Sequence, residues 1–201
     1  GLTNEHVSIA KQRMPNFPIY MQYGWTPKSH FRAAAIIRSM SYDNLTAHKT
    51  ESEIGWGVLA SATFNVMNCL QVYGQGVYGK GIGQFLNDMS LLNVDVVPNP
   101  EKEGKMQVLP MMGWFAGMQY NFSPKVFITS TYGQSRLYSH DGYPTTPSEQ
   151  YRYGQYLNAT LFWNITSDLQ VGAEYLRGWR TDFNGDTRHA NRMNLAVQYS
   201  F

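Results

Sequence analysis

Apolar and polar residues alternate along much of this chain. At the carboxyl end the apolar positions are Met193, Leu195, Val197, Tyr199 and Phe201, and the positions between them are polar or small. Because successive side chains of a β-strand point to opposite faces, this pattern predicts a strand with one apolar and one polar face. The same alternation recurs in the middle of the chain, within residues 54–66, 112–122 and 156–165.

Nine segments from about residue 16 onwards have the composition and bounding turn residues of strands. They cover residues 17–25, 29–41, 52–66, 70–83, 106–122, 125–138, 150–165, 168–181 and 189–201. Several exceed the five or six residues that are usual in soluble sheets. They are long enough to cross a bilayer at a tilt, which takes about 9–11 residues.

The connections between these segments alternate in length. Tight turns at 25–29, 66–69, 123–125 and 166–168 alternate with longer polar loops at 42–51, 84–105, 139–148 and 182–188. Short turns on one rim and long loops on the other are typical of an up-and-down transmembrane β-barrel, whose short turns face the periplasm. The last strand then ends at the periplasmic rim on Phe201, and a terminal aromatic residue is habitual in bacterial outer-membrane barrels.

The predicted fold is therefore all-β, an antiparallel up-and-down transmembrane β-barrel, of which residues 1–201 form the carboxyl-terminal portion with about nine strands. Nine strands is an odd number, whereas single-chain bacterial barrels have even numbers. The chain begins with Gly1 rather than Met. We therefore expect further strands to precede Gly1, and residues 1–16 to be the tail of a preceding loop.

Composition agrees with a barrel and excludes several other classes of protein. Hydrophobic residues make up 43% and aromatic residues 14% of the chain, while mean hydropathy is only −0.39. No run approaches the roughly 18 apolar residues of a membrane-spanning helix, and abundant aromatic residues suit the two interfacial girdles of a barrel. One cysteine, Cys69, excludes an internal disulfide framework. A net charge of +2 gives no reason to expect nucleic acid as a partner.

Three motifs resemble ligand sites but are better explained otherwise. Residues 74–79 match G-x-G-x-x-G, and 74–80 most of a phosphate loop, yet they alternate as a strand and Gly81 follows the lysine. Residues 182–186 place oxygen ligands at alternate positions without the later glutamate of a calcium loop, so an Asn-Gly turn explains them better. The five histidines have no metal-ligand spacing, and no nucleophile elbow occurs. We expect no metal, cofactor or catalytic site.

Charge on the predicted lumen face is the best functional clue. The candidate pore-lining residues are Arg32, Arg38, Arg152, Glu174, Arg180, Arg188 and Arg192. Guanidinium groups on a channel wall attract anions and bind carboxylates with two hydrogen bonds. They can equally serve to hydrate the lumen or to pair with acidic loop residues. Arg177 has the lipid-facing parity, where contact with a lipid headgroup or a strand offset would explain it.

Several stretches resemble the later half of DcaP-like outer-membrane porins. They are residues 13–23, 31–38, 55–57, 78–85, 171–176, 184–186, 190–192 and the final strand. The resemblance implies a sixteen-stranded homotrimeric diffusion porin of the bacterial outer membrane, surrounded by lipid and often passing small anionic solutes. It also implies recognition of the last strand, ending in Phe201, by the barrel assembly machinery. The family's amino-terminal helical segment and inward-folded constriction loop would be absent here.

Two other classes of protein remain open at this point. An outer-membrane enzyme or adhesin on the same barrel would need a polar cluster near the mouth, for example around His140 and Asp141. A soluble β-sandwich or ligand-binding barrel would show similar alternation but would purify without detergent.

Overall fold

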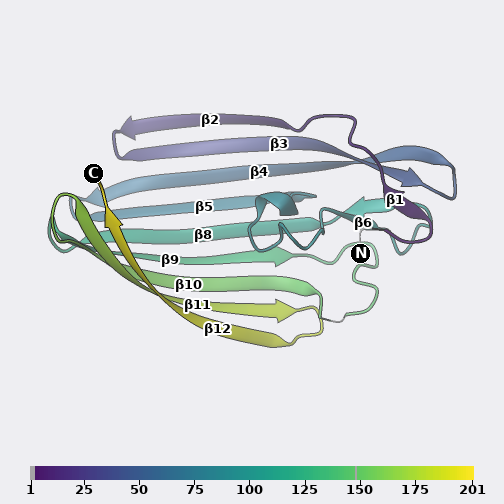
Figure 1. Cartoon of the computed structure of the whole chain (residues 1–201). Helices are drawn as coiled ribbons and strands as arrows, with labels where there is room; N and C mark the ends of the chain where they lie inside the picture. The colour runs from purple at the N-terminus through teal and green to yellow at the C-terminus, as the bar shows by residue number, and fades with distance from the viewer. Residues whose placement is uncertain (1–2, 148) are drawn as a thin grey trace.

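The computed structural model describes residues 3–147 and 149–201 as one long, curved antiparallel sheet (Figure 1). Nine long strands pair in chain order, and each is antiparallel to its neighbours. They are β2 (Phe17–Thr26), β3 (Ser29–Asn44), β4 (Lys49–Met67), β5 (Leu70–Lys80), β8 (Pro110–Asn121), β9 (Val126–Leu137), β10 (Tyr151–Asn164), β11 (Leu169–Asp182) and β12 (Thr187–Tyr199). Within the described residues no helix is long and apolar enough to cross a membrane, which does not bear on crossing by strands.

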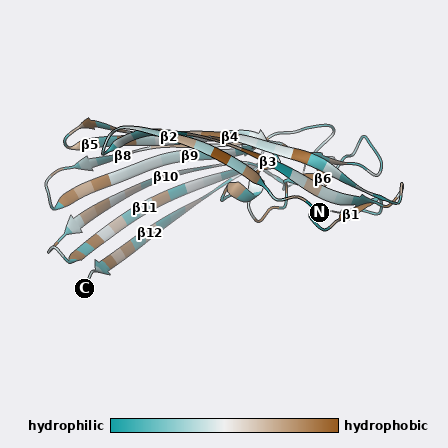
Figure 2. Cartoon of the chain, turned by 90° about the horizontal axis from the view of Figure 1, so that it is seen from above, coloured by the Kyte–Doolittle hydropathy of each residue, from teal (hydrophilic) through white to brown (hydrophobic). Residues whose placement is uncertain are grey.

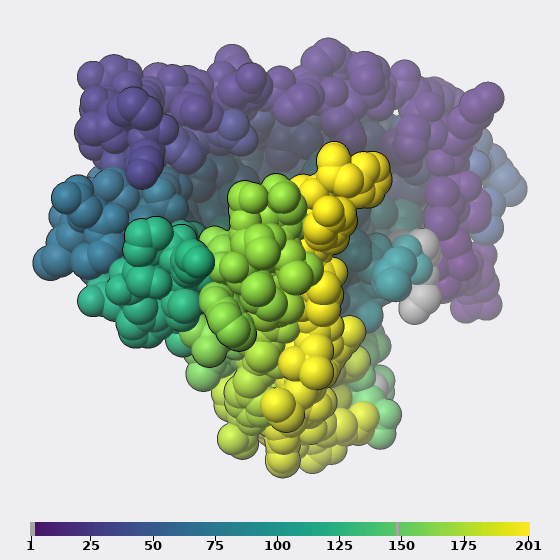
Figure 3. All heavy atoms as spheres, turned by 60° about the vertical axis from the view of Figure 1, so that its left-hand side comes forward, coloured from purple at the N-terminus to yellow at the C-terminus, as the bar shows by residue number. Residues whose placement is uncertain are grey.

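The all-β, antiparallel up-and-down organisation is confirmed, and each of the nine predicted strands corresponds to a strand of this sheet. A β-sandwich is wrong, because the nine long strands lie in a single sheet rather than in two packed sheets. Among the described residues no ladder joins β12 to β2, so these two strands form the sheet edges. Figure 3 shows the resulting hollow between β2 and β3, in purple, and β12, in yellow.

Two predicted segments differ from the structure. The segment 70–83 ends as a strand at Lys80, because Gly81 adopts a positive φ of 66° and turns the chain away from the sheet. The segment 106–122 is two strands. Its first part, β7 (Met106–Val108), pairs with β6 (Val96–Pro98) in a small separate hairpin. The sheet resumes at Pro110, after the fully buried Leu109.

The amino-terminal region also contains a strand that was not predicted. Within the expected loop tail 1–16, the three residues of β1 (Val7–Ile9) pair with the far end of β3. Val7 is fully buried there beside Tyr42 and Met106. Residues 1 and 2 of that tail, and Ser148 at the end of the loop 139–148, lie outside the described residues.

One face of the sheet is apolar and uncovered; we call it the outer face. It carries alternate residues of every strand, in cross-strand rows such as Ile19, Ala35 and Val58. Large apolar side chains along it are strongly exposed, including Leu195 at 83%. Such a broad apolar surface is far outside what a soluble monomer exposes, and it marks a surface that contacts a membrane or another protein.

Aromatic side chains gather near both ends of the outer face. The turn-end belt comprises Tyr23, Trp25, Phe31, Phe64, Tyr120, Phe122, Trp163 and Tyr199, and the loop-end belt comprises Phe17, Trp56, Tyr78, Trp114, Tyr132 and Trp179. On β4 the two belts are eight residues apart, roughly 27 Å of strand. That length is close to the apolar band, about 25 Å tall, that separates the aromatic girdles of transmembrane barrels.

The opposite, inner face is concave and is partly covered by the chain between β5 and β8. This segment, residues 81–109, includes η1 (Gly83–Phe85) and the β6–β7 hairpin. Figure 2 shows it on the concave side of the sheet. Its buried apolar residues Ile82, Leu86, Met89, Val94, Val97 and Leu109 form the main core with Met111, Leu137 and Tyr151 of the sheet.

The predicted polar loop 84–105 is thus an inward-folded segment, although the resemblance implied that an inward-folded constriction loop would be absent. Glycine makes the close approach possible. A Cβ on Gly57 would lie 3.0 Å from Ile82, and one on Gly113 would lie 2.5 Å from Leu86. The inner-face glycines therefore make room for the segment on the wall.

Candidate functional site

The strand register places six of the seven predicted pore-lining residues on the inner face. Arg32 and Arg38 of β3 lie opposite Ser61 and Gly55 of β4. The remaining four are Glu174, Arg180, Arg188 and Arg192, which share the parity of Gly154, Thr160 and Asn194 on β10–β12. Alternation along the sequence therefore predicted the correct face of the sheet for these six residues. Their hydrogen-bond partners and their exposure to solvent differ from one residue to the next.

Arg38 anchors segment 81–109 and is not a free charge on the wall. Its Nη1 donates to Asp95 Oδ2 at 2.7 Å and to the carbonyl oxygen of Gly81. The guanidinium also lies over the ring of Phe85, 5.3 Å from its centroid. The side chain is only 9% exposed. Arg38 was expected to meet a solute directly, and this burial places it behind the segment instead.

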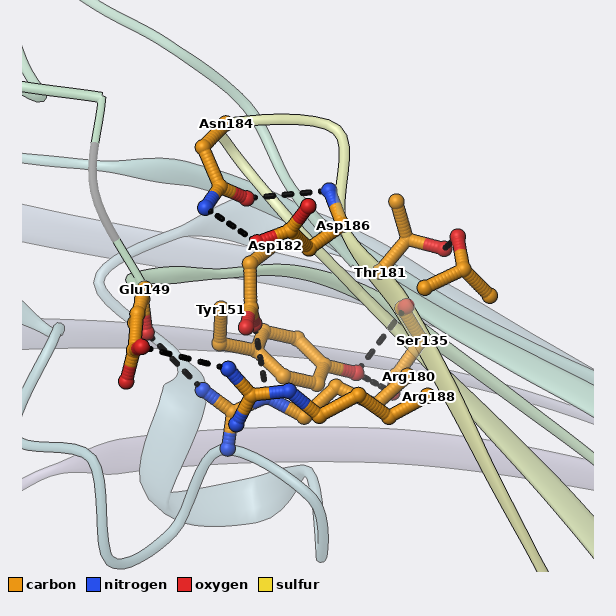
Figure 4. Close-up of polar contacts among 10 residues, drawn as sticks. Ser135, Glu149, Tyr151, Arg180, Thr181, Asp182, Asn184, Asp186 and Arg188 are labelled. Carbon is orange, nitrogen blue, oxygen red and sulfur yellow. Dashed lines mark hydrogen bonds and ion pairs between the residues drawn. The ribbon is translucent and has the colours of Figure 1, made fainter.

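Arg180 and Arg188 converge on one acidic residue at the loop end of the inner face (Figure 4). Arg180 donates from Nε to Asp182 at 2.7 Å and from Nη2 to the carbonyl oxygen of Glu149 at 3.1 Å. Arg188 Nη2 lies 3.3 Å from Glu149 Oε1. Both arginine side chains stay about half exposed, at 45% and 58%. Each therefore keeps N–H groups available to the space in front of the wall.

That space is a hollow of about 540 Å³ bounded by β10–β12 and by segment 81–109. Gly154, Gly178, Arg180 and Arg188 of the sheet and Asp88 of the segment all line it. Asp88 accepts a hydrogen bond from the Ser135 hydroxyl at 2.6 Å. Two arginines and one carboxylate therefore line a single hollow on the inner face.

Glu174 occupies the middle of the wall and is held by neutral donors. Its Oε1 accepts from Asn194 at 2.6 Å, and its Oε2 accepts from Asn158 at 3.1 Å and Thr160 at 3.2 Å. Arg192 on the neighbouring strand donates from Nε to the side-chain oxygen of Asn194 at 2.7 Å. Glutamate and arginine are thereby connected through one asparagine.

Arg32 lies apart from the other charges, towards the turn end. Its Nε and Nη2 both donate to Gln22 Oε1, at 3.0 and 2.8 Å. Its guanidinium lies 5.3 Å from the centre of the Tyr20 ring. Much of the surrounding inner face consists of uncharged amides and hydroxyls: Thr63, Asn65, Gln71, Tyr73, Gln119, Asn121, Thr129, Thr131, Asn164, Gln170 and Gln198.

Arg152 is the seventh predicted residue, and the structure places it away from this group. It lies at an irregularity of β10 between Tyr151 and Tyr153, so simple alternation fails at this position. Its guanidinium is 6.0 Å from the ring of Tyr153, and it lines a hollow with the outer-face residue Arg136. Arg177, predicted to face lipid, has outer-face parity opposite Leu157 and stacks on Trp179.

Sequence reasoning missed Asp88 and Asp95, because it assigned their segment to an exterior polar loop. The available signal was the recurrence of apolar residues at Leu86, Met89 and Val94. Such residues within a connection of this length indicate that it packs against something.

A further charged cluster connects the hairpin between β3 and β4 to segment 81–109. It lies on the loop side of Ile54, where the apolar outer face of β4 begins. Glu51 accepts from Lys105 at 2.6 Å, lies 2.7 Å from Lys49, and accepts from the Tyr42 hydroxyl at 2.8 Å. Hydrogen bonds from Lys105, Lys49 and Tyr42 lower the pKa of Glu51 to about 2. The segment is therefore held at both of its ends, by Arg38 and by Glu51.

The motifs set aside in the sequence have ordinary structural roles. Residues 74–79 lie within β5, where a Cβ on Gly79 would come within 2.1 Å of the Trp56 carbonyl oxygen. Residues 182–186 form a tight turn in which Gly185 has a φ of 93°. In the part of the chain that the structure describes, no three His, Cys, Asp or Glu side chains are grouped to hold a metal.

Comparison with solved structures identifies the fold. The outer membrane channel DcaP of Acinetobacter baumannii superposes with a TM-score of 0.79 at 20% sequence identity, over 99% of this chain and 55% of that one. This chain therefore spans about half the length of that channel and has its fold over nearly all of its own length. The NanC porin gives a TM-score of 0.47 at 8% identity, over 92% and 93% of the two chains, which is too weak to indicate a shared fold. No protein-family model and no curated protein sequence matches the chain.

Proposed function

We propose that this chain is part of a DcaP-like outer-membrane porin, and that the complete protein is a passive diffusion channel for small hydrophilic, preferentially anionic solutes. The observation that carries the proposal is the contrast between the two faces of one sheet. The outer face exposes apolar side chains between two aromatic belts, as a lipid-facing barrel wall does. The inner face is polar and carries exposed guanidinium groups.

Anion preference is supported by the charge balance of that inner face. Apart from the cluster around Glu51 at the β3–β4 hairpin, Arg32, Arg180, Arg188 and Arg192 outnumber Glu174 among the exposed or half-exposed charges of the inner-face strands, and Asp88 of segment 81–109 lines the hollow with two of them. Basic side chains lining a pore raise the local concentration of anions and favour their passage. Arg180 and Arg188 carry the larger share of this role, because both are half exposed and line one hollow on the inner face.

The same proposal includes assembly and location. The outer-membrane lipid covers the apolar face, the complete barrel has sixteen strands, and three copies associate. The barrel assembly machinery recognises β12, whose outer-face side chains lead to the aromatic carboxyl-terminal residue Phe201. The fold shared with the DcaP channel over 99% of this chain supports this part.

Single-channel recording of the full-length protein in a planar bilayer tests the function. A salt gradient gives the anion-to-cation permeability ratio for wild type and for an Arg180→Gln/Arg188→Gln variant. We expect an anion-preferring channel whose ratio falls several-fold in the variant. Lys28→Gln/Lys125→Gln removes the same charge at exposed turn-end positions and should change the ratio little. Absence of any conductance would overturn the porin proposal, and an unchanged ratio would remove the two arginines from it.

A further inference from the structure

A second pair of arginines lies at the loop end of the sheet: Arg136 on the outer face, and Arg152 at the irregularity of β10. Arg136 of β9 lies opposite Met112 and Tyr153 and shares the parity of the exposed Trp114 and Leu157. Arg152 and Arg136 line one polar hollow of about 720 Å³. The hollow is closed by the loop 138–144 and by Pro147 and Phe183.

The two guanidinium groups of this hollow lie over one aromatic ring. The centre of the Tyr153 ring is 5.8 Å from Arg136 Cζ and 6.0 Å from Arg152 Cζ. In the described residues neither arginine has a carboxylate within 4.0 Å, and Arg136 Nε is buried without a hydrogen-bond partner. Two like charges beside one ring repel each other. An anion in the hollow that contacts both would offset that repulsion and would satisfy the free donors.

The depth of the hollow indicates the kind of anion. Arg136 lies two residues beyond Gln134, whose side chain accepts from the Trp114 indole at 3.4 Å. Trp114 belongs to the loop-end belt, and aromatic belts sit at the level of lipid headgroups. Two residues of strand place Arg136 roughly 7 Å farther out. This is the layer where the phosphates of the surrounding lipid lie, rather than the hydrocarbon or the lumen.

The hollow contains other charged groups, but they do not neutralise the positive charge of Arg136 and Arg152. Asp141 is the carboxylate there, and its Oδ1 lies 3.4 Å from Nδ1 of His140. The other ring nitrogen of His140 lies 3.4 Å from Lys80 Nζ, another outer-face cation. Asp141 thus has its own partner, and the two arginines remain in excess.

We propose that Arg136 and Arg152 bind the phosphorylated headgroup of an anionic lipid in the leaflet that surrounds the loop end of the sheet. The inference rests on the membrane orientation in the proposed function, but it concerns the lipid face and not transport. Tyr138 and Tyr153 stack on Arg136, and Tyr153 also stacks on Arg152, which fixes both guanidinium groups at the rim of the hollow.

Native mass spectrometry of the full-length protein in a neutral detergent tests this site. The probes are diphosphorylated lipid A, phosphatidylethanolamine and inorganic phosphate. We expect selective binding of lipid A, weakened roughly 30-fold in Arg136→Gln/Arg152→Gln. The charge-matched Lys28→Gln/Lys125→Gln variant should bind as wild type does. Equal binding by the arginine variant, or displacement of lipid A by millimolar phosphate, would overturn the proposal.

A second variant keeps the test decisive if the double substitution does not fold. Asp141 has a φ of 38°, a conformation that asparagine also tolerates. Asp141→Asn should therefore fold, and removal of the opposing charge should tighten lipid A binding severalfold; unchanged or weaker binding contradicts the site. Conductance of the same samples separates the two proposals. If the protein conducts but does not select lipid A, only the lipid-binding inference is wrong. If it selects lipid A but does not conduct, only the porin proposal is wrong.

Discussion

Arg38 and Asp95 form a salt bridge of 2.7 Å that joins the wall of the sheet to a segment arising 43 or more residues later in the chain. Their side chains are 9% and 18% exposed. Removal of one partner leaves the other charge poorly solvated, whereas an exposed ion pair can be removed at little cost. This pair therefore acts together with the apolar core and the Glu51–Lys105 contact to hold segment 81–109 on the inner face.

Arg38→Gln should loosen the segment and destabilise the protein by about 3 kcal/mol, the lower end of the range for breaking a buried pair. Hydrogen–deuterium exchange should rise in residues 83–97, and single-channel traces should become noisier. Arg32→Gln is the matched control, because Arg32 is on the same strand and face but bonds only to Gln22. Equal exchange in the two variants would mean that the salt bridge does not hold the segment.

Glu174→Gln should increase anion preference. The substitution removes a negative charge from the middle of the inner face, and its single amide oxygen can accept from Asn158 and Thr160 or from Asn194 but not from all three. We expect the anion-to-cation permeability ratio to rise about twofold or more, with a loss of stability of about 1 kcal/mol for the lost hydrogen bond. Reversal potentials in a salt gradient measure the ratio. A fall in the ratio would contradict the proposed orientation of Glu174 towards the solute path.

The interaction of Glu51 with its lysines should depend on pH in acid. The folded-state pKa of about 2 lies below the ordinary value of 4.5. The stabilisation is therefore complete above pH 4.5 and is lost as the pH falls through 2. Glu51→Gln should unfold at a lower temperature than wild type at pH 7, and the two unfolding temperatures should converge between pH 4.5 and 2. A difference that stays constant over this range would exclude the charge of Glu51 as its cause.

Two glycines of β5 should respond differently to alanine. A Cβ on Gly79 would lie 2.1 Å from the carbonyl oxygen of Trp56, whereas a Cβ on Gly76 meets nothing within 4 Å. We expect Gly79→Ala to destabilise the protein by about 3 kcal/mol, as overpacking against backbone does, and Gly76→Ala to change stability by less than about 0.5 kcal/mol. Urea unfolding in vesicles measures both. If the two variants had similar free energies of unfolding, β4 and β5 would be less closely packed at Gly79 than the structure shows.

The sheet could be predicted from the sequence because alternation is a local property. Strands such as β4, β8, β10 and β12 have a clear apolar parity that the outer face exposes, whereas the alternation in β5 and β9 is too irregular to assign a face from sequence; tight turns such as 123–125 set antiparallel neighbours. The parity of Arg32, Glu174 and Arg192 followed from the same rule. Alternation could not place Arg152, because an irregularity of β10 intervenes between Tyr151 and Tyr153.

The inner-face segment could not be predicted in this way, because its position depends on contacts distant in sequence. Nothing local in residues 81–109 indicates that Arg38 will pair with Asp95, or that Gly113 leaves space for Leu86. The same limit applies to Asp88, which gains its position opposite Arg180 only through the packing of Met89 and Leu86 in the core. The sequence can therefore predict which charged residues lie on the inner face, but their exposure to solvent follows only from the tertiary structure.

The central claim is that lipid, and not another layer of protein, covers the outer face. Single cysteines at Met193, Asn194, Leu195 and Ala196 of β12, in full-length protein with Cys69→Ser, can each carry a fluorophore in vesicles. We predict that brominated acyl chains quench the label at 193 and 195, and that aqueous iodide quenches it at 194 and 196. Quenching by iodide at all four positions, without alternation, would contradict the account.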